Sequence, residues 1–374
     1  MRAEHPAPPA TPQPQQQQQQ PQQQPQPQQQ PQQRRQREGQ GHATAVAHPN
    51  IALIKYWGKR DERLVLPRVD SLSMTLDIFP TTTRVHLAPR ADHDTLTLGG
   101  RPAQGETLRR VTAFLDLVRA QAGRSERAVV DSHNTVPTGA GLASSASGFA
   151  ALAVAAAAAY GLGLDATAHS RLARRGSGSA SRSIFAGFAL WHAGPPTAAT
   201  ETEADLGSYA EPVPAAGLDP ALVIAVVNAG PKAVSSREAM RRTLDTSPLY
   251  EPWARSSKDD LSEMRAALRR ADLEAVGEIA ERNALGMHAT MLAARPAVRY
   301  LAPATLTVLD SVLQLRKDGV CAYATMDAGP NVKVLCPRAD AEKVAQTVRD
   351  AVPDGSVLIA RPGPGARLLP RERR

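Results

Sequence analysis

Apolar runs and helical patterns alternate regularly along the C-terminal half of the chain. Their order is β-α-β-β-α-β, which is the split βαβ or ferredoxin-like arrangement. A long segment, 231–303, interrupts it after the first strand, and apolar spacing there predicts a helical insertion with helices at 259–270 and 273–292. The predicted strands are 222–228, 320–327, 331–336 and 356–361, and the predicted helices are 305–317 and 340–351.

The N-terminal half starts with short β patterns and then becomes helical. An amphipathic helix is predicted at 107–122, and a strand at 128–133 leads through a Pro-Gly loop into an Ala-rich helix. The chain is therefore predicted to be α+β, with an N-terminal α+β domain and a C-terminal ferredoxin-like domain. The further strands predicted in the N-terminal half are 43–46, 51–57, 72–79, 83–87 and 95–98.

The two ends of the chain differ in composition from the rest. Residues 1–41, rich in Gln and Pro, cannot bury enough apolar surface to offset the entropy of ordering, and we expect disorder there. The 374 residues are long enough for two domains. We place the N-terminal domain at 42–220, the C-terminal domain at 221–366 and a basic tail at 367–374.

The charge and the cysteines exclude several classes of protein. The tails supply most of the formal net charge of +8, and no basic stripe with interleaved aromatics remains to bind nucleic acid. Two cysteines make neither a disulfide scaffold nor a metal cluster, which favours the cytoplasm. The uncharged stretch 142–164 is mostly Ala, so we expect a buried helix and no membrane span.

The loop VPTGAGLASSAS, residues 136–147, has the composition of a phosphate-binding turn. Its glycines let backbone N–H groups turn toward an anion, and its serines stand at a helix N-terminus, where the dipole favours negative charge. No Gly-Lys-Ser/Thr follows, so it is not a Walker loop. On its own the segment fits equally well a glycine turn that caps a helix.

Two further residues stand out for their chemistry. Asp327 is a lone carboxylate between two apolar runs, just before a Gly-Pro turn; it could be a catalytic base or a turn acid. His288 lies on a largely apolar helix beside methionines, and we interpret it as a packed core histidine without a catalytic role.

Five motifs together resemble one branch of the GHMP small-molecule kinase superfamily, the diphosphomevalonate decarboxylases. The resemblance runs in order from about residue 43 to 336. It implies ATP-dependent phosphorylation of the 3-hydroxyl of (R)-5-diphosphomevalonate, followed by loss of phosphate and CO₂ to give isopentenyl diphosphate, in a Mg²⁺-using homodimer. The motifs are PTGAGLASSAS, NIALIKYWGKRD (50–61), RRGSGSASRSIFAGF (174–188), KAVSSREAMRRTLDTSPLY (232–250) and ERNALGMHATM (281–291) with TMDAGPNVKVL (325–335).

The resemblance also implies roles for particular residues. Asp327 would be the general base, Lys55 would stabilise the forming alkoxide, and Asn50 would support that network by hydrogen bonding. Arg182 would hold the substrate carboxylate in a bidentate fork. If 51–57 continues as a strand, alternation places Lys55 and Lys59 toward one site.

The remaining implied contacts fall into three sets. Those to the substrate diphosphate are Tyr56, Trp57, Gly58 and Lys59. Other substrate contacts are Ser177, Gly178, Ser179, Ala180, Ser181, Ser235, Ser236 and Arg237. Those to ATP are Pro137, Gly139, Ala140, Gly141, Leu142, Ala143, Ser144 and Ser145. The sequence shows no protein ligand cluster for a metal, so Mg²⁺ would be held mainly by the nucleotide phosphates.

Two other functions fit part of the sequence. A GHMP kinase acting on a mevalonate-like alcohol without decarboxylation would share the loop and the acid, but would need Arg182 less. An interaction protein built on a degenerate enzyme would recruit partners through the Gln/Pro tail. The presence of Lys59, Ser144, Arg182 and Asp327 argues against degeneracy.

Overall fold

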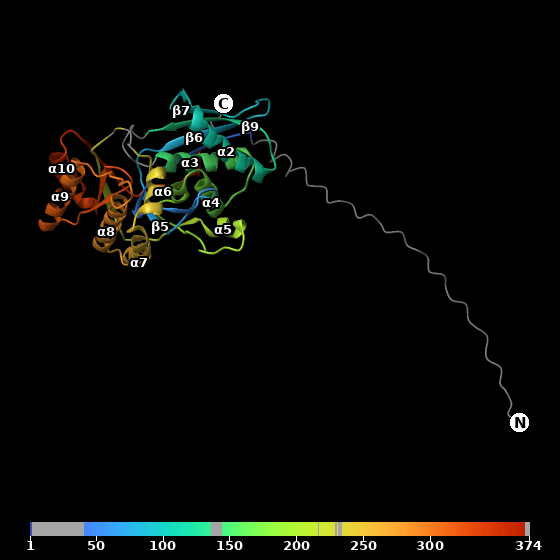
Figure 1. The fold of residues 1–374 in the computed structure, drawn as a ribbon. Coiled ribbons are helices and arrows are strands. Elements are labelled where there is room, and N and C mark those ends of the chain that lie inside the picture. The colour runs from blue at the N-terminus through green and yellow to red at the C-terminus, as the bar shows by residue number, and fades with distance from the viewer. Residues whose placement is uncertain (2–40, 136–143, 216, 229, 231–233, 371–374) are drawn as a thin grey trace. The chain divides into compact units, whose positions relative to one another are not determined.

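The computed structural model describes Met1 and residues 41–135, 144–215, 217–228, 230 and 234–370 (Figure 1). By its internal contacts the chain divides into Met1–Gly39 and Gln40–Arg374, and the described helices and sheets belong to the second unit. These helices and sheets confirm the predicted α+β class.

The largest sheet of the described residues is packed on one face by helices. Its strand order is β16-β1-β6-β9-β7-β8, and only β7 and β9 pair in parallel. Alternating residues of β6 and β9 point inward and meet the apolar faces of α2 and α3, which run beneath the sheet (Figure 1). The elements are β1 (His42–Ala47), β6 (Thr81–Ala88), β7 (Thr95–Leu98), β8 (Arg101–Pro102), β9 (Arg127–Asn134), β16 (Arg367–Leu368), α2 (Gly105–Ala122), α3 (Ser144–Ala159) and α4 (Ala166–Gly176).

The predicted ferredoxin-like order is confirmed in the C-terminal half. Strands β12, β13, β14 and β15 form an antiparallel sheet in the order β13-β14-β12-β15, and α9 and α10 pack on one face of it. The elements are β12 (Pro220–Val226), α9 (Pro303–Lys317), β13 (Tyr323–Met326), β14 (Val332–Pro337), the short 3₁₀ helix η2 (Arg338–Asp340), α10 (Ala341–Ala351) and β15 (Ser356–Ala360).

The helical insertion joins the two halves through a shared core. Its helices α7 and α8 pack against the other face of the C-terminal sheet and against a second N-terminal sheet, of order β11-β10-β5-β2. α8 contacts both β2 and β13, which are edge strands of these two sheets. The elements are β2 (Asn50–Ile54), β5 (Ser71–Thr75), β10 (Phe188–Trp191), β11 (Ala210–Pro212), α6 (Ser236–Thr246), α7 (Tyr250–Arg269) and α8 (Leu273–Leu292).

Several short elements were not predicted from the hydrophobic pattern, because they have too few residues to show a period. They are β3 (Lys59–Asp61), β4 (Leu66–Pro67), the 3₁₀ helix η1 (Gly178–Ile184) and α5 (Glu201–Gly207). Residues 367–368, which the sequence suggested were part of a tail, form β16 and pair with β1. The predicted strand 51–57 ends at Ile54, so the prediction of a strand through residue 57 is wrong, and alternation along it cannot be used to place Lys55 and Lys59.

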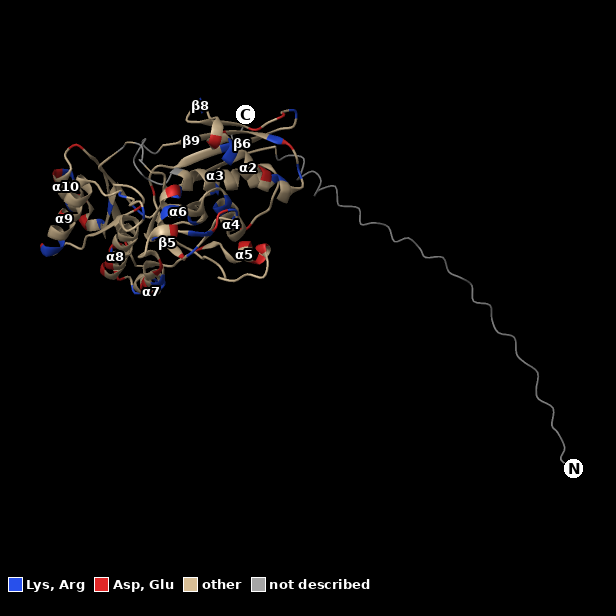
Figure 2. Cartoon of the chain, viewed as in Figure 1, with Lys and Arg blue, Asp and Glu red and all other residues tan. Residues whose placement is uncertain are grey.

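The Ala-rich stretch forms α3, as expected for a buried helix. Its alanines are enclosed by β1, β6, η1 and α4. No helix of the described residues is long and apolar enough to cross a membrane. Along α7, basic and acidic residues are interspersed, which is the pattern of a solvated surface (Figure 2).

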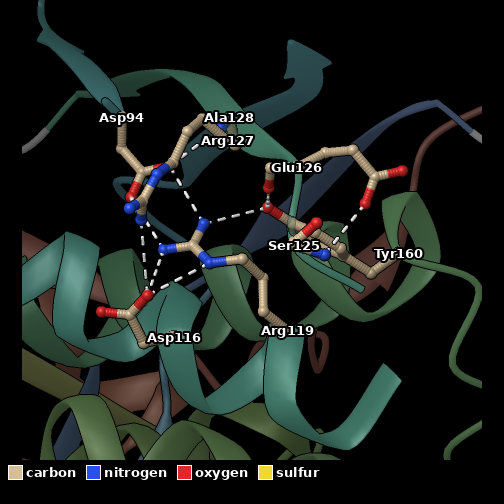
Figure 3. Close-up of polar contacts among 8 residues, drawn as sticks. All are labelled: Asp94, Asp116, Arg119, Ser125, Glu126, Arg127, Ala128 and Tyr160. Carbon is tan, nitrogen blue, oxygen red and sulfur yellow. Dashed lines mark hydrogen bonds and ion pairs between the residues drawn. The ribbon is translucent and has the colours of Figure 1, made fainter. Parts of the chain in front are cut away.

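A buried ion-pair network ties α2 to the largest sheet (Figure 3). Both carboxylate oxygens of Asp94 accept from the Arg119 guanidinium, at 3.0 and 2.9 Å, and one also accepts from the Ala128 N–H at 2.8 Å. Arg119 donates as well to the Tyr160 hydroxyl and to Asp116. Asp94 is fully buried at its side chain, whereas that of Asp116 is 56% exposed.

Asp94→Asn is expected to lower the free energy of unfolding by about 3–5 kcal/mol, because it removes the buried counter-charge of the Arg119 guanidinium and leaves only the exposed Asp116 to pair with it. Asp116→Asn is the matched control, since it removes a carboxylate from the same arginine at an exposed position, with an expected loss below about 1 kcal/mol. Urea unfolding followed by circular dichroism measures both. Equal losses in the two variants would contradict this account.

Candidate functional site

Asp327 lies in the turn that follows the edge strand β13. Its main-chain carbonyl accepts from the Gly329 N–H at 2.7 Å, which closes a tight turn before Pro330. The turn is fixed from outside, because the Thr305 hydroxyl donates to the Pro330 carbonyl at 2.7 Å. The Asp327 side chain remains 29% exposed, so a ligand can still reach the carboxylate.

Two buried lysines bind the two oxygens of this carboxylate. Lys55 Nζ lies 2.9 Å from Oδ1 and Lys333 Nζ lies 3.2 Å from Oδ2, and both lysine side chains are 2% exposed. Lys55 follows β2, and Lys333 belongs to β14, the neighbour of β13. The ion pair therefore joins the edge of an N-terminal sheet to the C-terminal sheet.

Arg182 lies on η1 and is held by neutral oxygens. Its Nε donates to Ser73 Oγ at 2.9 Å, and its terminal nitrogens donate to Ser71 Oγ at 2.5 Å and Asn50 Oδ1 at 3.3 Å. Its guanidinium carbon lies 5.7 Å from the centre of the Trp191 ring. A guanidinium has five N–H donors, so this one can still bind an anion.

Asn50 begins β2, the strand that leads to Lys55, and links it to the serine-rich segment 177–183. Its side-chain amide donates to the Ser179 carbonyl at 2.9 Å and to Ser183 Oγ at 2.8 Å. Within the segment, the Ser181 hydroxyl donates to the Gly178 carbonyl at 2.7 Å. Asn50, Lys55, Arg182 and Asp327, all predicted from the sequence, are thus brought together.

The charges of this cluster do not balance. Lys55, Lys333 and Arg182 face one carboxylate, which leaves two positive charges in excess among these residues. Burial lowers the pKa of Lys55 to about 8, against the opposing effect of Asp327, and burial lowers the pKa of Arg182 to about 10. Burial alone would raise the pKa of Asp327, but the two lysines hold it well below its ordinary value. Excess buried positive charge favours an anionic ligand.

The aromatic residues after Lys55 pack tightly beside the cluster. Tyr56 stacks edge-on against Trp191, with ring centres 4.7 Å apart, and its buried hydroxyl has no hydrogen-bond partner among the described residues. Gly58 has a φ of 100°, and a Cβ there would lie 1.9 Å from the Tyr250 hydroxyl, so only glycine fits. That hydroxyl donates to the Trp57 carbonyl at 2.8 Å.

Other predicted contact residues bond to groups outside this cluster. Lys59, in β3, forms an ion pair with Glu62. Ser235 caps α6 through the Glu238 N–H, and the exposed Arg237 lies 3.6 Å from Glu106 of α2. Ser236 belongs to the same first turn of α6.

Most of the predicted phosphate loop, residues 136–143, lies outside the described residues. They include the predicted ATP contacts Pro137, Gly139, Ala140, Gly141, Leu142 and Ala143. Ser144 begins α3. The hydroxyls of Ser145 and Ser177 lie 3.3 Å apart, which brings the start of α3 next to the start of η1. The loop thus leads into a helix that reaches the serine-rich segment.

Several residues of the cluster were missed from the sequence. Lys333 could have been found, because it pairs with Thr325 across the predicted hairpin and so lies on the side of the sheet from which Asp327 extends. Ser71 and Ser73 alternate on β5 but carry no distinguishing signal. Asn283 lies in an apolar helix and was missed. His288, predicted as a packed core histidine, is buried, but its contact with the Asp327 carbonyl, 3.2 Å from Nε2, was not foreseen.

Among the described residues, no group of three His, Cys, Asp or Glu side chains could hold a metal ion. The two oxygens of Asp327 are occupied by lysines. The described part of the site therefore offers a magnesium ion few protein ligands, which fits an ion that is bound mainly through phosphate oxygens and water.

Two family models match the chain over most of its length. The diphosphomevalonate decarboxylase-like N-terminal domain matches residues 47–202, and the mevalonate 5-diphosphate decarboxylase C-terminal domain matches residues 222–360. Diphosphomevalonate decarboxylase mvd1 of Aspergillus fumigatus is 37% identical over 330 residues, covering 82% of this chain and 80% of the relative.

Solved structures agree with these matches. The mevalonate diphosphate decarboxylase from Enterococcus faecalis superposes with a TM-score of 0.80 at 43% identity, covering 88% of this chain and 98% of the other. A structure described as MDDEF in complex with MVAPP, AMPPCP and magnesium has a TM-score of 0.82 at 44% identity, with the same coverage.

Proposed function

The chain belongs to the diphosphomevalonate decarboxylase family, and from that premise we propose that it converts (R)-5-diphosphomevalonate and ATP into isopentenyl diphosphate, ADP, phosphate and CO₂, a step of isoprenoid biosynthesis by the mevalonate pathway. The observation that carries the proposal is the convergence of Arg182, Lys55 and Asp327 from distant parts of the chain. A reacting hydroxyl beside Asp327 and a carboxylate beside Arg182 would lie within one small molecule.

The proposed reaction has two stages, and atoms and electrons balance in each. In the first, the 3-oxygen of the substrate bonds to the γ-phosphorus of ATP, ADP leaves, and the hydroxyl proton passes to Asp327. In the second, the C–O bond breaks with its electrons going to phosphate, the electrons of the C–CO₂ bond form the alkene, and CO₂ departs. Arg182 holds the carboxylate so that the breaking bonds are aligned.

The lysines decide how Asp327 acts as a base. They keep it ionised, which makes it a strong hydrogen-bond acceptor but a weak base. Phosphoryl transfer has a loose transition state and depends mainly on position and electrostatics. The proton therefore moves to Asp327 late, when bonding to phosphorus has made the substrate oxygen acidic. Lys55 and Lys333 are cations, and they stabilise the negative charge that builds up on the substrate oxygen.

ATP and the diphosphate are assigned to neighbouring segments. We place the nucleotide on the loop before α3 and on Ser145 in the first turn of that helix, and the substrate diphosphate near Tyr56, Trp57, Gly58 and Lys59. Tyr56 supports this assignment because its buried hydroxyl can bond to a ligand oxygen. Magnesium supplies charge neutralisation of the phosphates when bound.

The domain bounds, the oligomeric state and the cellular location are proposed by analogy with the family. We propose an N-terminal domain at 42–220 and a C-terminal domain at 221–366, with the function shared between them. The protein would act as a homodimer in the cytoplasm, with ATP and diphosphomevalonate as its small-molecule partners.

The proposed function is tested by measuring ADP, CO₂ and isopentenyl diphosphate in one reaction, with 5-phosphomevalonate as a comparison substrate. Equal amounts of ADP, CO₂ and isopentenyl diphosphate are expected. ADP formed with a stable 3-phosphate and no CO₂ would instead identify a kinase that stops at phosphorylation.

A pH profile tests the part played by Lys333. In Lys333→Met one cation leaves Asp327, so the pKa of the carboxyl group rises toward its ordinary value. The acid limb of kcat/KM, which reports protonation of the base, is expected to move to higher pH by about 1–3 units. Single-turnover measurement between about pH 3 and pH 7, a range that begins just below the ordinary carboxyl pKa, follows this limb in the variant, whereas the limb of the unchanged protein lies below that range.

The control is Lys333→Arg, which keeps the positive charge at the same position. Its acid limb is expected to stay near that of the unchanged protein. An acid limb that does not move in Lys333→Met would show that Lys333 has no electrostatic effect on Asp327.

A further inference from the structure

We propose that α8 positions the Lys55–Asp327 pair from both sides, with Asn283 holding the main chain at Lys55 and His288 holding the main chain at Asp327. Both are positioning residues, since they contact the reacting groups' backbone and act only through them. The inference rests on the proposed function for the identity of the reaction, and measuring ADP separately from CO₂ distinguishes the failure of one from the failure of the other.

Asn283 connects Lys55 to α7. Its Oδ1 accepts from the Lys55 N–H at 2.9 Å, and its Nδ2 donates to Ser257 Oγ at 3.0 Å and Asp260 Oδ2 at 2.8 Å. The side chain is buried, and these bonds fix which way its amide faces. The main chain at Lys55, just past the end of β2, is thereby anchored to the insertion.

His288 makes the corresponding bond on the other side. Its Nε2 lies 3.2 Å from the Asp327 carbonyl oxygen, which can only accept, so Nε2 carries the proton. The ring is 2% exposed. Burial and the charge of Lys55 lower the pKa of His288 to about 4, so the ring stays neutral near pH 7 and adds no further cation beside Asp327.

The geometry of a helix explains how one element reaches both partners. Residues five apart are separated by about 7.5 Å along the axis and by about 140° around it. Asn283 and His288 can therefore face the end of β2 and the turn after β13, both of whose strands α8 contacts. The helix lies close to β13, because a Cβ at Gly277 would lie 2.3 Å from the Tyr323 ring.

The side chains that face Asp327 come from four places, and no other described side chain duplicates this role. The Gly329 N–H also bonds to the Asp327 carbonyl, but it belongs to the same turn and does not tie the turn to another element. Lys55 after β2 and Lys333 on β14 bind its side chain, while Arg182 on η1 acts on it through charge. His288 instead binds the main chain, whose position sets where the carboxylate points. Errors of about 1 Å in such placement can cost about 100-fold in rate.

The test is the rate of ADP formation in His288→Phe, which keeps a ring but loses the donor. We expect kcat to fall by about 10–100-fold with KM for both substrates within about twofold, because placement and not binding is affected. His288→Gln, whose amide can still donate, should recover most of the rate. Thermal melting checks that each variant folds.

A double variant distinguishes positioning from general damage. In an Asp327→Asn background, His288→Phe is expected to cause no further loss, because its effect passes through Asp327. Thr290→Val is the matched control: its buried hydroxyl bonds within α8, to the Met287 carbonyl, and kcat should be unchanged. An unaltered kcat in His288→Phe, or an equal loss in both backgrounds, would overturn the proposal.

ADP formation is the measured quantity because it does not depend on decarboxylation. If the unchanged protein makes ADP without CO₂, the proposed function fails while the role of α8 can still be judged. If CO₂ is released in step with ADP and His288→Phe has no effect, only the role of α8 fails.

Discussion

Asp327→Asn is expected to lower kcat by about 10²–10⁴-fold while leaving the affinity for substrate and ATP largely unchanged. The amide has nearly the same shape as the carboxylate but cannot take the hydroxyl proton. It also leaves Lys55 and Lys333 without their shared counter-charge, so the affinity for the anionic substrates is not expected to fall. Single-turnover ADP formation and equilibrium binding measure the two effects separately.

Thr325→Val serves as the control for this substitution. Thr325 lies two residues upstream on β13, is buried, and has a hydroxyl without a partner among the described residues, so replacing it by a methyl group should leave kcat unchanged. Should Asp327→Asn retain more than about a tenth of the original kcat, general base catalysis by this residue would be ruled out.

Arg182→Lys is expected to reduce CO₂ release by about 100-fold and to reduce ADP formation much less. Lysine keeps the charge but is a point donor and cannot hold a carboxylate in two parallel hydrogen bonds. The 3-phosphorylated substrate would then form with its carboxylate poorly aligned, and it would accumulate. Rapid-quench measurement of ADP and CO₂ in the same reaction gives both rates.

Ser73→Ala is the companion variant for Arg182. It removes the hydroxyl that accepts from Arg182 Nε but keeps the guanidinium, so a smaller fall in CO₂ release is expected. Equal reductions of ADP and CO₂ in Arg182→Lys would mean that Arg182 serves substrate binding or phosphoryl transfer, and the assignment to the carboxylate would be wrong.

Hydrophobic periodicity was a good guide to the longer elements. The helices 107–122 and 305–317 agree with α2 and α9 to within two residues, because each buries a continuous apolar face. The periodicity misled at β2. There the chain is buried on both sides and has an irregular register between Ala52 and Ile54, so period-two alternation says nothing about where Lys55 points.

His288 shows how a correct local interpretation can be incomplete. Its apolar helix predicted a buried histidine, and the ring is buried. What the pattern could not show is the partner, because the Asp327 carbonyl is 39 residues away in sequence. Lys333 was missed for a related reason, since a lysine inside a strand pattern is usually read as exposed.

The sequence by itself determined the class of fold, the strand order of the C-terminal half and the family, because these depend on local periodicity and on short motifs. Only the tertiary structure decided the charge balance around Asp327 and the link that α8 makes between Lys55 and Asp327. Burial and pairwise distance set those properties. Both arise when strands from separate sheets meet, and spacing along the chain does not report them.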